Sequence, residues 1–306
     1  MTKNYLVYVN GGFIPSQEAS VSVFDHGLLY GDGIFEGIRV YDGVVFQLDA
    51  HLTRLYQDAK AIRLAMPLAK KALEEAVLET LRRNKLVNAY IRLVVTRGTG
   101  DLGLNPRKCP HPTVIIIAKP VDALHGAEAK QRGLHTIIAA TRRHPVDTTS
   151  HEIKSLNYLN SILAILEANT QGADDAIMLD SRGFVAEATG TTLFAVQNGQ
   201  LYTPPLYASI LDGITRRFII SLARELNYPV TERDLTVFQL RNVDEIFLCG
   251  TMGEVVPVVS IDGQPVGVGK PGPITRHLLE EYSQRVKDPQ HGTPIQSRAA
   301  PAPKTM

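Results

Sequence analysis

Lys154 and Tyr158, four residues apart, are the side chains of this sequence best placed to act on a carbonyl compound. Apolar residues at helical spacing predict a helix over about residues 156–169, which would put Tyr158 about one helical turn from Lys154. A lysine amine attacks a carbonyl only when it is unprotonated, and the free side chain has a pKa of ~10.4. Neighbouring cations favour the neutral amine. Cationic residues precede Lys154 at Arg142, Arg143, His144 and His151.

A surface position is the commoner interpretation of a lone lysine, but the motifs around Lys154 favour the chemical one. Lys154 with residues 157–161 (Asn-Tyr-Leu-Asn-Ser) resembles the cofactor-lysine motif of the fold-type IV pyridoxal-phosphate aminotransferases. The resemblance extends, in the same order, over nearly the whole chain, from residue 5 to about residue 282. The other matching segments are residues 30–39, 51–55, 187–194, 212–216 and 250–254.

The resemblance is strongest to the branched-chain-amino-acid aminotransferases. It implies transamination dependent on pyridoxal 5'-phosphate between a branched-chain L-amino acid (Leu, Ile or Val) and 2-oxoglutarate, in a ping-pong reaction through an internal aldimine at Lys154. A D-amino-acid or (R)-amine aminotransferase of the same fold is the first alternative, and an aminodeoxychorismate lyase the second. A non-catalytic protein that merely binds the cofactor is a different class. The combined presence of Lys154, Tyr158, Glu187 and Arg54 argues against it.

Pyridoxal 5'-phosphate requires a lysine, a carboxylate for the ring nitrogen, a partner for the phenolic oxygen and a phosphate cradle. Glu187 follows a turn at residues 180–183 and could keep the pyridine nitrogen protonated, although its spacing fits a solvated strand-end acid equally well. Tyr158 could hydrogen-bond the phenolic oxygen, and a core tyrosine is its alternative. The sequence thus offers a candidate for each of the first three requirements.

Helix ends supply the candidates for the phosphate cradle. Residues 212–215 open an amphipathic helix whose free backbone N–H groups suit an anion, with Ile214 and the Thr215 hydroxyl at its first turn. Thr251 adds a second hydroxyl after Gly250. Arg54 lies on a helix predicted after Asp49; a solvated arginine is the ordinary interpretation, whereas the resemblance implies a bidentate phosphate clamp.

Strand alternation supplies the candidates for substrate binding. Phe35, Gly37 and Arg39 share one face of a predicted strand, and Tyr90 and Arg92 share a face of another. Each arginine on such a face needs a partner, either a substrate carboxylate or an internal acid.

The resemblance assigns these positions to parts of a substrate pocket. It implies an apolar side-chain pocket from Tyr30, Phe35 and Gly37. The α-carboxylate would meet Tyr90 and the turn at residues 251–253, and Arg92 would help with the second carboxylate of glutamate. Met252 and Gly253 replace the small residues usual in the family, which affects substrate preference rather than the reaction.

The pattern of elements predicts an α+β protein of two domains: a smaller α/β domain over residues 1–120 and a larger cofactor-binding domain over 134–286, with a pseudo-barrel of strands. Residues 121–133 are expected to be a linker. Residues 287–306, rich in Pro, Ala, Gln and Lys, are expected to be a disordered tail.

The composition narrows the function classes. The formal net charge of +1 over 306 residues argues against nucleic-acid and membrane-surface binding. No apolar run approaches the ~20 residues of a membrane span, no signal peptide begins the chain, and two cysteines make no disulfide framework, so a cytoplasmic enzyme is expected. No histidine spacing predicts a metal site. In relatives, a loop like the glycine-rich residues 97–106 reaches the partner's pocket, so the resemblance implies a homodimer or a higher homo-oligomer.

Overall fold

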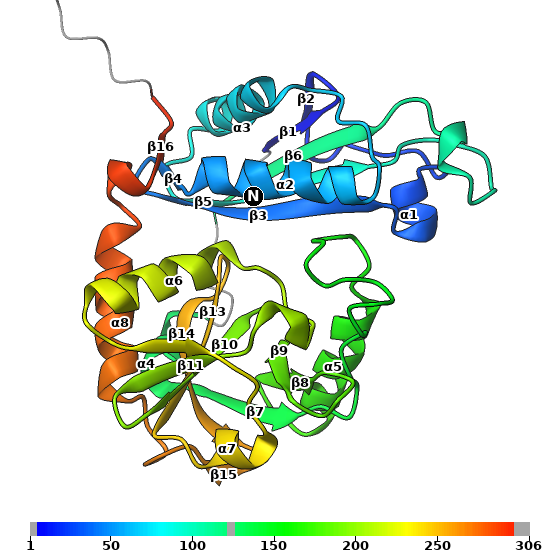
Figure 1. The fold of residues 1–306 in the computed structure, drawn as a ribbon. Coiled ribbons are helices and arrows are strands. Elements are labelled where there is room, and N and C mark those ends of the chain that lie inside the picture. Colours follow the sequence, from blue (N-terminus) through cyan, green and yellow to red (C-terminus); the bar gives the residue numbers. More distant parts are fainter. Residues whose placement is uncertain (1–4, 121–125, 297–306) are drawn as a thin grey trace, which may run out of the picture.

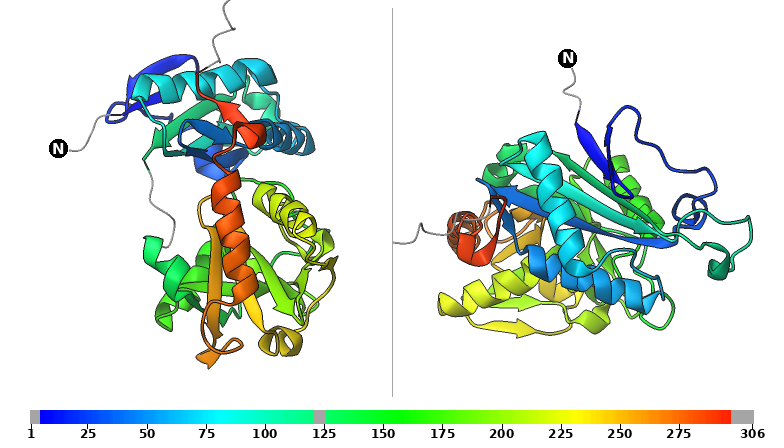
Figure 2. Two further views of the ribbon diagram at one scale, coloured as in Figure 1. Left: turned by 90° about the vertical axis from the view of Figure 1, so that its left-hand side faces the viewer. Right: turned by 90° about the horizontal axis from the view of Figure 1, so that it is seen from above.

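The computed structural model describes residues 5–120 and 126–296. Two lobes, each built on one β-sheet, lie one above the other, and the last long helix, α8 (Pro273–Arg285), runs along the C-terminal lobe and ends at the N-terminal lobe (Figure 1; Figure 2). Helices and strands do not alternate strictly along the chain in either lobe, so the predicted α+β class is confirmed.

The N-terminal lobe is a seven-stranded sheet in the order β16-β4-β3-β5-β6-β1-β2, with α2 and α3 packed on one face (Figure 1). Apolar side chains of both helices and of the central strands form one buried cluster. Two hairpins of this sheet, β1–β2 and β3–β4, are closed by Asn-Gly and Asp-Gly turns at positive φ. The elements are β1 (Leu6–Val9), β2 (Gly12–Pro15), α1 (His26–Tyr30), β3 (Gly33–Tyr41), β4 (Val44–Phe46), α2 (Leu48–Ala61), α3 (Lys70–Asn84), β5 (Ala89–Thr96), η1 (Pro106–Lys108) and β6 (Thr113–Lys119).

The C-terminal lobe is a nine-stranded sheet in the order β12-β11-β10-β13-β14-β7-β8-β9, with β15 paired to β14. Three parallel pairings, β11 with β12, β14 with β7 and β7 with β8, lie within an otherwise antiparallel sheet. Its elements are α4 (Gly126–Arg132), β7 (Leu134–Ile138), α5 (Leu159–Thr170), β8 (Asp175–Leu179), β9 (Val185–Ala188), β10 (Thr192–Gln197), β11 (Gln200–Thr203), η2 (Leu206–Ala208), α6 (Ile214–Glu225), β12 (Val230–Glu232), α7 (Val237–Arg241), β13 (Glu245–Gly250), β14 (Glu254–Ile261) and β15 (Gln264–Pro265).

Two expectations about connecting segments are wrong. The predicted linker contains α4, whose residue Ala129 belongs to the core of the C-terminal lobe. The predicted disordered tail contains η3 (Pro289–His291) and β16 (Gly292–Pro294), and β16 pairs with β4 of the N-terminal sheet. Backbone pairing satisfies the polar groups of this segment, a long-range interaction that its composition could not reveal. Residues 121–125 and 297–306 of these two predictions lie outside the described residues.

The segment that carries Lys154 is extended and lies against the N-terminal sheet. Phe35 N donates to Lys154 O at 3.0 Å, and Leu156 N donates to Gly33 O at 2.9 Å. A Cβ at Gly33 would lie 2.7 Å from Leu156 Cδ1, so the glycine permits this close approach. The lysine of the larger lobe is therefore held in place by a strand of the smaller one. No helix in the described part of the chain is long and apolar enough to span a membrane.

Candidate active site

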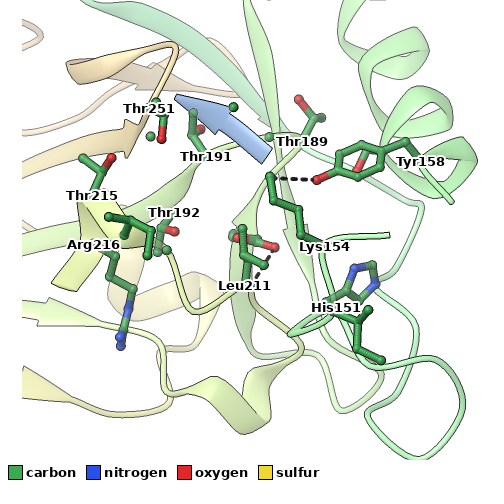
Figure 3. A pocket seen from close by; sticks show the side chains of 18 of the residues that line it. His151, Lys154, Tyr158, Thr189, Thr191, Thr192, Leu211, Thr215, Arg216 and Thr251 are labelled. Carbon is green, nitrogen blue, oxygen red and sulfur yellow. Dashed lines mark hydrogen bonds between the residues drawn. The ribbon is translucent and has the colours of Figure 1, made fainter. Parts of the chain in front are cut away.

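A cavity of about 270 Å³ lies between the two lobes. Most of its lining comes from the C-terminal lobe, and the N-terminal lobe contributes Gly37, Arg54 and Tyr90. Figure 3 shows Lys154 at its centre, with Tyr158 on one side and Thr191, Thr215 and Thr251 on the other. The cavity is close in size to the smallest typical small-molecule pockets, about 300 Å³.

Lys154 Nζ donates a hydrogen bond to Tyr158 Oη over 3.2 Å (Figure 3). The predicted proximity is confirmed. Lys154 lies before the helix, as expected, but α5 begins at Leu159 rather than near residue 156, with Tyr158 as its N-cap, so the contact is not made across a helical turn. The extended segment brings the two side chains together. The ring of Phe35 lies 4.6 Å from the amine and meets the Tyr158 ring edge-on at 5.2 Å.

Glu187 is buried in β9, within the lining of the cavity. Its Oε1 atom lies 3.1 Å from Arg143 Nη2 and accepts a hydrogen bond from Leu211 N at 3.3 Å. Burial raises the pKa of this carboxyl, and the charge of Arg143 opposes the rise. The strand-end position expected for Glu187 is confirmed, whereas a solvated acid is excluded by its burial.

The first turn of α6 meets the cavity without a side-chain cap. Its N-cap is Gly213, so Asp212 does not cap the helix, and Ile214 and Thr215 line the cavity. The Thr191 hydroxyl, buried in the same lining, has no hydrogen-bond partner among the described residues. Uncapped N–H groups and an unpaired hydroxyl are donors that an anion would satisfy.

Arg54 reaches the cavity from α2 and is buried rather than solvated. Its Nε and Nη2 donate to the two oxygens of Glu36 at 2.7 and 2.8 Å, and its Nη1 donates to Asp212 O at 2.8 Å. Glu36 therefore occupies the Nε edge of the guanidinium. One hydrogen on each Nη atom is left for a ligand, so the Nη edge is the part of Arg54 on which the predicted bidentate phosphate contact would form.

Glu36 is itself held from two sides. His51 Nδ1 lies 2.8 Å from Glu36 Oε2, and both side chains are buried. Burial alone would raise the pKa of Glu36, but Arg54 and His51 lower it to about 2. Burial also lowers the pKa of His51, against the opposing effect of Glu36. The network fixes the orientation of Arg54 before any ligand binds.

Asp58 follows Arg54 by one turn of α2, and its Oδ2 accepts a hydrogen bond from Lys154 N at 3.1 Å. Burial raises the pKa of Asp58 to about 6. Glu36, Asp58 and Thr191 were not among the predicted site residues, and Arg143 was predicted only as a cation near Lys154. Glu36 carried a signal, because it is a carboxylate between Ile34 and Ile38 on one strand face and therefore needed a partner.

The substrate-binding candidates divide into two groups. Tyr90, Gly37 and Met252 line the cavity. Arg92 does not, but its Nη2 lies 3.5 Å from Tyr90 Oη and its guanidinium stacks 4.4 Å from the Phe35 ring. The remaining candidates, Tyr30, Phe35, Arg39 and Gly253, also lie outside the lining.

Two of the outlying candidates have partners within the chain. Arg39 Nη2 pairs with Glu254 Oε1 at 3.2 Å, so an internal acid, rather than a substrate, supplies its partner. Tyr30 Oη donates to Leu102 O in the glycine-rich loop. Within the described residues, no group of three or more His, Cys, Asp or Glu side chains could hold a metal ion.

Residues 33–261 match the family model for amino-transferase class IV. The chain belongs to this family, within its branched-chain-amino-acid aminotransferase group. It is 52% identical, over 90% of its length and 94% of the relative, to a Methanocaldococcus jannaschii protein described as a "Putative branched-chain-amino-acid aminotransferase". It is 38% identical to the branched-chain-amino-acid aminotransferase of Escherichia coli K12, over 90% of this chain and 91% of that one.

Solved structures of this aminotransferase group share the fold. The T.th. branched-chain amino acid aminotransferase with pyridoxamine 5'-phosphate superimposes with a TM-score of 0.91 at 38% identity, over 96% of this chain and 99% of that one. The same enzyme was also solved with N-(5'-phosphopyridoxyl)-L-glutamate. The predicted two-domain fold, the enzyme class and the pyridoxal-phosphate cofactor of the family are confirmed.

The residues of this aminotransferase meet the requirements of that cofactor. The amine of Lys154, the carboxylate of Glu187 and the hydroxyl of Tyr158 line one cavity with the uncapped turn of α6. The unpaired hydroxyl of Thr191 and the two remaining Arg54 hydrogens are donors suited to a phosphate. The buried lining therefore fits pyridoxal 5'-phosphate.

Proposed function

We propose that this enzyme transfers the amino group of Leu, Ile or Val to 2-oxoglutarate in a ping-pong reaction, with pyridoxal 5'-phosphate held by Lys154. The observation that carries the proposal is the Lys154 amine, 3.2 Å from Tyr158 Oη, in a cavity shared with Glu187 and the first turn of α6. The names of the relatives support the branched-chain substrates.

Bound pyridoxal 5'-phosphate supplies an electron sink for the negative charge that develops at the substrate α-carbon. The Lys154 amine would act as the base that takes the substrate α-proton and returns it to the opposite side of the transamination. Tyr158 would hydrogen-bond the phenolic oxygen as well as that amine. Glu187 would keep a proton on the pyridine nitrogen. Arg54, Ile214 N, Thr215 and Thr251 would hold the phosphate.

Substrate binding is proposed for the N-terminal side of the cavity. Tyr90 Oη and the backbone of the turn at residues 251–253 would bind the α-carboxylate, and Arg92, adjacent to Tyr90, would approach the second carboxylate of glutamate. Phe35 and Gly37 offer apolar surface for the side chain of Leu, Ile or Val. Because Arg39 is paired with Glu254, it is assigned to positioning this turn instead of to substrate.

A panel of amino donors tests the proposal. L-Leu, D-Ala, (R)-1-phenylethylamine and aminodeoxychorismate are compared with 2-oxoglutarate as acceptor, following the cofactor's absorbance in half-reactions and product in full turnover. The fastest reaction is expected with L-Leu. Turnover of D-Ala together with inactivity towards L-Leu would reassign the enzyme to the D-amino-acid branch of the fold.

We also propose a homodimer. Four apolar side chains of α5 are 46–67% exposed, and Leu28, Leu102 and Leu104 are 63–78% exposed. These elements lie on one side of the molecule in Figure 1, and contiguous exposed apolar surface marks interfaces. The four side chains of α5 are Leu159, Ile162, Leu163 and Leu166.

Light scattering after size-exclusion chromatography tests the dimer. A wild-type protein of dimer mass is expected, and the double variant Ile162→Glu, Leu166→Glu is expected to be monomeric. Phe238→Glu, at an exposed site on α7, is the matched control that keeps the dimer. A wild-type monomer would contradict the proposal.

We also propose a cytoplasmic location for the enzyme. Two free, buried cysteines, Cys109 and Cys249, support it, and cell fractionation tests it.

A further inference from the structure

Arg143 is a buried arginine that lines the cavity and that the reaction described above does not use. Its Nη1 donates to Ser161 Oγ at 3.0 Å and its Nη2 donates to Ala188 O at 2.8 Å. Its backbone N donates to Leu179 O. Three anchors from α5, β8 and β9 thus hold its charge next to Glu187, 3.1 Å from Oε1.

The contacts of Glu187 are unequally divided between its two oxygens. Arg143 Nη2 and Leu211 N both approach Oε1. Oε2 is therefore the oxygen available to a ligand in the cavity.

Other cations near Glu187 are engaged elsewhere. Lys154 Nζ is bonded to Tyr158 Oη, and Arg216 Nη2 is bonded to Glu232 at 2.6 Å and to Pro204 O. Arg143 is the cation that forms an ion pair with Glu187 within the described residues. Burial opposes ionisation of Glu187, and the charge of Arg143 counteracts it.

We propose that Arg143 is a positioning residue whose charge keeps the proton shared by Glu187 and the cofactor on the pyridine nitrogen. This inference rests on the proposed function. A cation closer to the carboxylate than to the ring stabilises the pair of ring N–H⁺ and carboxylate⁻ over the neutral pair of ring nitrogen and carboxylic acid. Removing the charge should move the proton towards Glu187 and weaken the electron sink.

The test uses holoenzyme reconstituted with ¹⁵N-labelled pyridoxal 5'-phosphate and reads the pyridine nitrogen by NMR. Wild type is expected to give a protonated nitrogen from weakly acidic to weakly alkaline pH. In Arg143→Met and Arg143→Gln the resonance should move towards the unprotonated value, and kcat should fall about tenfold, the effect of about one pKa unit. Arg143→Lys, which keeps the charge, should restore both readouts in part.

Two controls separate charge from structure. Ser161→Ala removes one anchor of Arg143 but keeps its charge, so the ¹⁵N resonance should stay at the wild-type position. In a Glu187→Gln background, Arg143→Gln should cause no further shift, because the acid it acts through is absent.

Several outcomes would overturn the inference. One is an unmoved resonance in a charge-removing variant that folds and binds cofactor. A second outcome is measured without any Arg143 variant. An infrared band of a protonated carboxyl in wild-type holoenzyme that is missing in Glu187→Gln would show that the proton resides on Glu187. Failure of the wild-type protein to bind pyridoxal 5'-phosphate would instead overturn the proposed function, so the two failures are distinguishable.

Discussion

The two lobes contribute different kinds of polar group to the cavity. The C-terminal lobe supplies groups that can still react or form hydrogen bonds with a ligand: the Lys154 amine, one oxygen of Glu187 and the uncapped turn of α6. The N-terminal lobe supplies groups whose polar atoms are largely engaged within the protein, such as Arg54 on Glu36 and Asp58 on Lys154 N. One lobe can react or bind, and the other holds the reacting groups in position.

This division predicts how substitutions in each lobe should act. Loss of a reacting group should lower the rate while the fold and much of the cofactor affinity are kept. Loss of a holding group should lower stability and affinity for cofactor or substrate more than the rate. A reacting-group variant that mainly lowers stability, or a holding-group variant that mainly lowers the rate, would contradict this division between the lobes.

Lys154→Ala should have the largest effect, because it removes both the attachment point of the cofactor and the proton-transferring amine. Transamination of L-Leu should fall by about 10²–10⁴-fold, the usual contribution of general acid–base catalysis, or more. Steady-state kinetics and the absorbance of the bound cofactor measure the change. The melting temperature should stay close to that of wild type.

Lys154→Arg is the matched control for this prediction. It keeps the charge and the contact with Tyr158 but offers no usable nucleophile, so it should be as inactive as Lys154→Ala. Full activity in either variant would assign the reaction to another lysine.

Glu36→Gln tests the holding lobe. Breaking its buried pairing with Arg54 and His51 should lower the free energy of unfolding by about 3 kcal/mol and weaken cofactor binding, with a smaller change in kcat. The folded-state pKa of about 2 lies below the ordinary value of 4.5, so this stability is present above pH ~4.5 and is lost as pH falls towards ~2. Denaturant unfolding at several pH values measures it.

Glu79→Gln is the comparison for that variant. Glu79 pairs with Arg82 and Arg83 on the solvated surface of α3, where water screens the charges, so its loss should lower the free energy of unfolding far less than the loss of Glu36. An equal loss of unfolding free energy in the two variants would mean that the buried Glu36 network stabilises the fold no more than a surface ion pair.

Local signals predicted the local structure. The turns at residues 10–11 and 42–43 combine an Asn or Asp with Gly, a pair that favours a tight turn between two strands. The helix after Lys154 begins later than predicted: Leu156 fits the apolar pattern, but backbone pairing with Gly33 keeps that residue extended. The hydrogen bond to a distant strand therefore outweighs the local helix propensity of this segment.

Partners far apart in sequence were beyond the reach of these signals. Arg54 and Glu36 are 18 residues apart, and alternation could say only that Glu36 lies on an apolar face. Arg143 could be predicted only as one of several cations near Lys154, because nothing local pairs it with Glu187 in β9. The site residues named by resemblance mostly line the cavity, whereas the residues that hold them appear only in three dimensions.

Gly37→Ala tests whether the N-terminal lobe positions the substrate carboxylate through Tyr90. A Cβ at this strand position would lie 2.0 Å from Tyr90 Oη, so the tyrosine must move from the place proposed for the substrate carboxylate. The KM for L-Leu should rise about tenfold, equivalent to about 1.4 kcal/mol, with a smaller change in kcat. Gly12→Ala, where the added atom meets an ordinary contact at 3.5 Å, is the matched control. An unchanged KM would place the carboxylate elsewhere.

Asp58→Asn is expected to have the opposite sign, because it removes a buried charge and keeps the hydrogen-bond acceptor that holds the lysine segment. Burial raises the pKa of Asp58 from 3.8 to about 6, so the folded protein binds a proton that the unfolded chain has released between these values. Stability from this group therefore falls as pH rises from ~4 to ~6. Asparagine keeps an oxygen that can accept from Lys154 N and carries no charge. The variant should be more stable than wild type by about 1–3 kcal/mol above pH ~6 and equal to it below pH ~4, by denaturant unfolding. A loss of stability at neutral pH would mean that the ionised carboxylate holds the lysine segment through its charge rather than through one hydrogen bond.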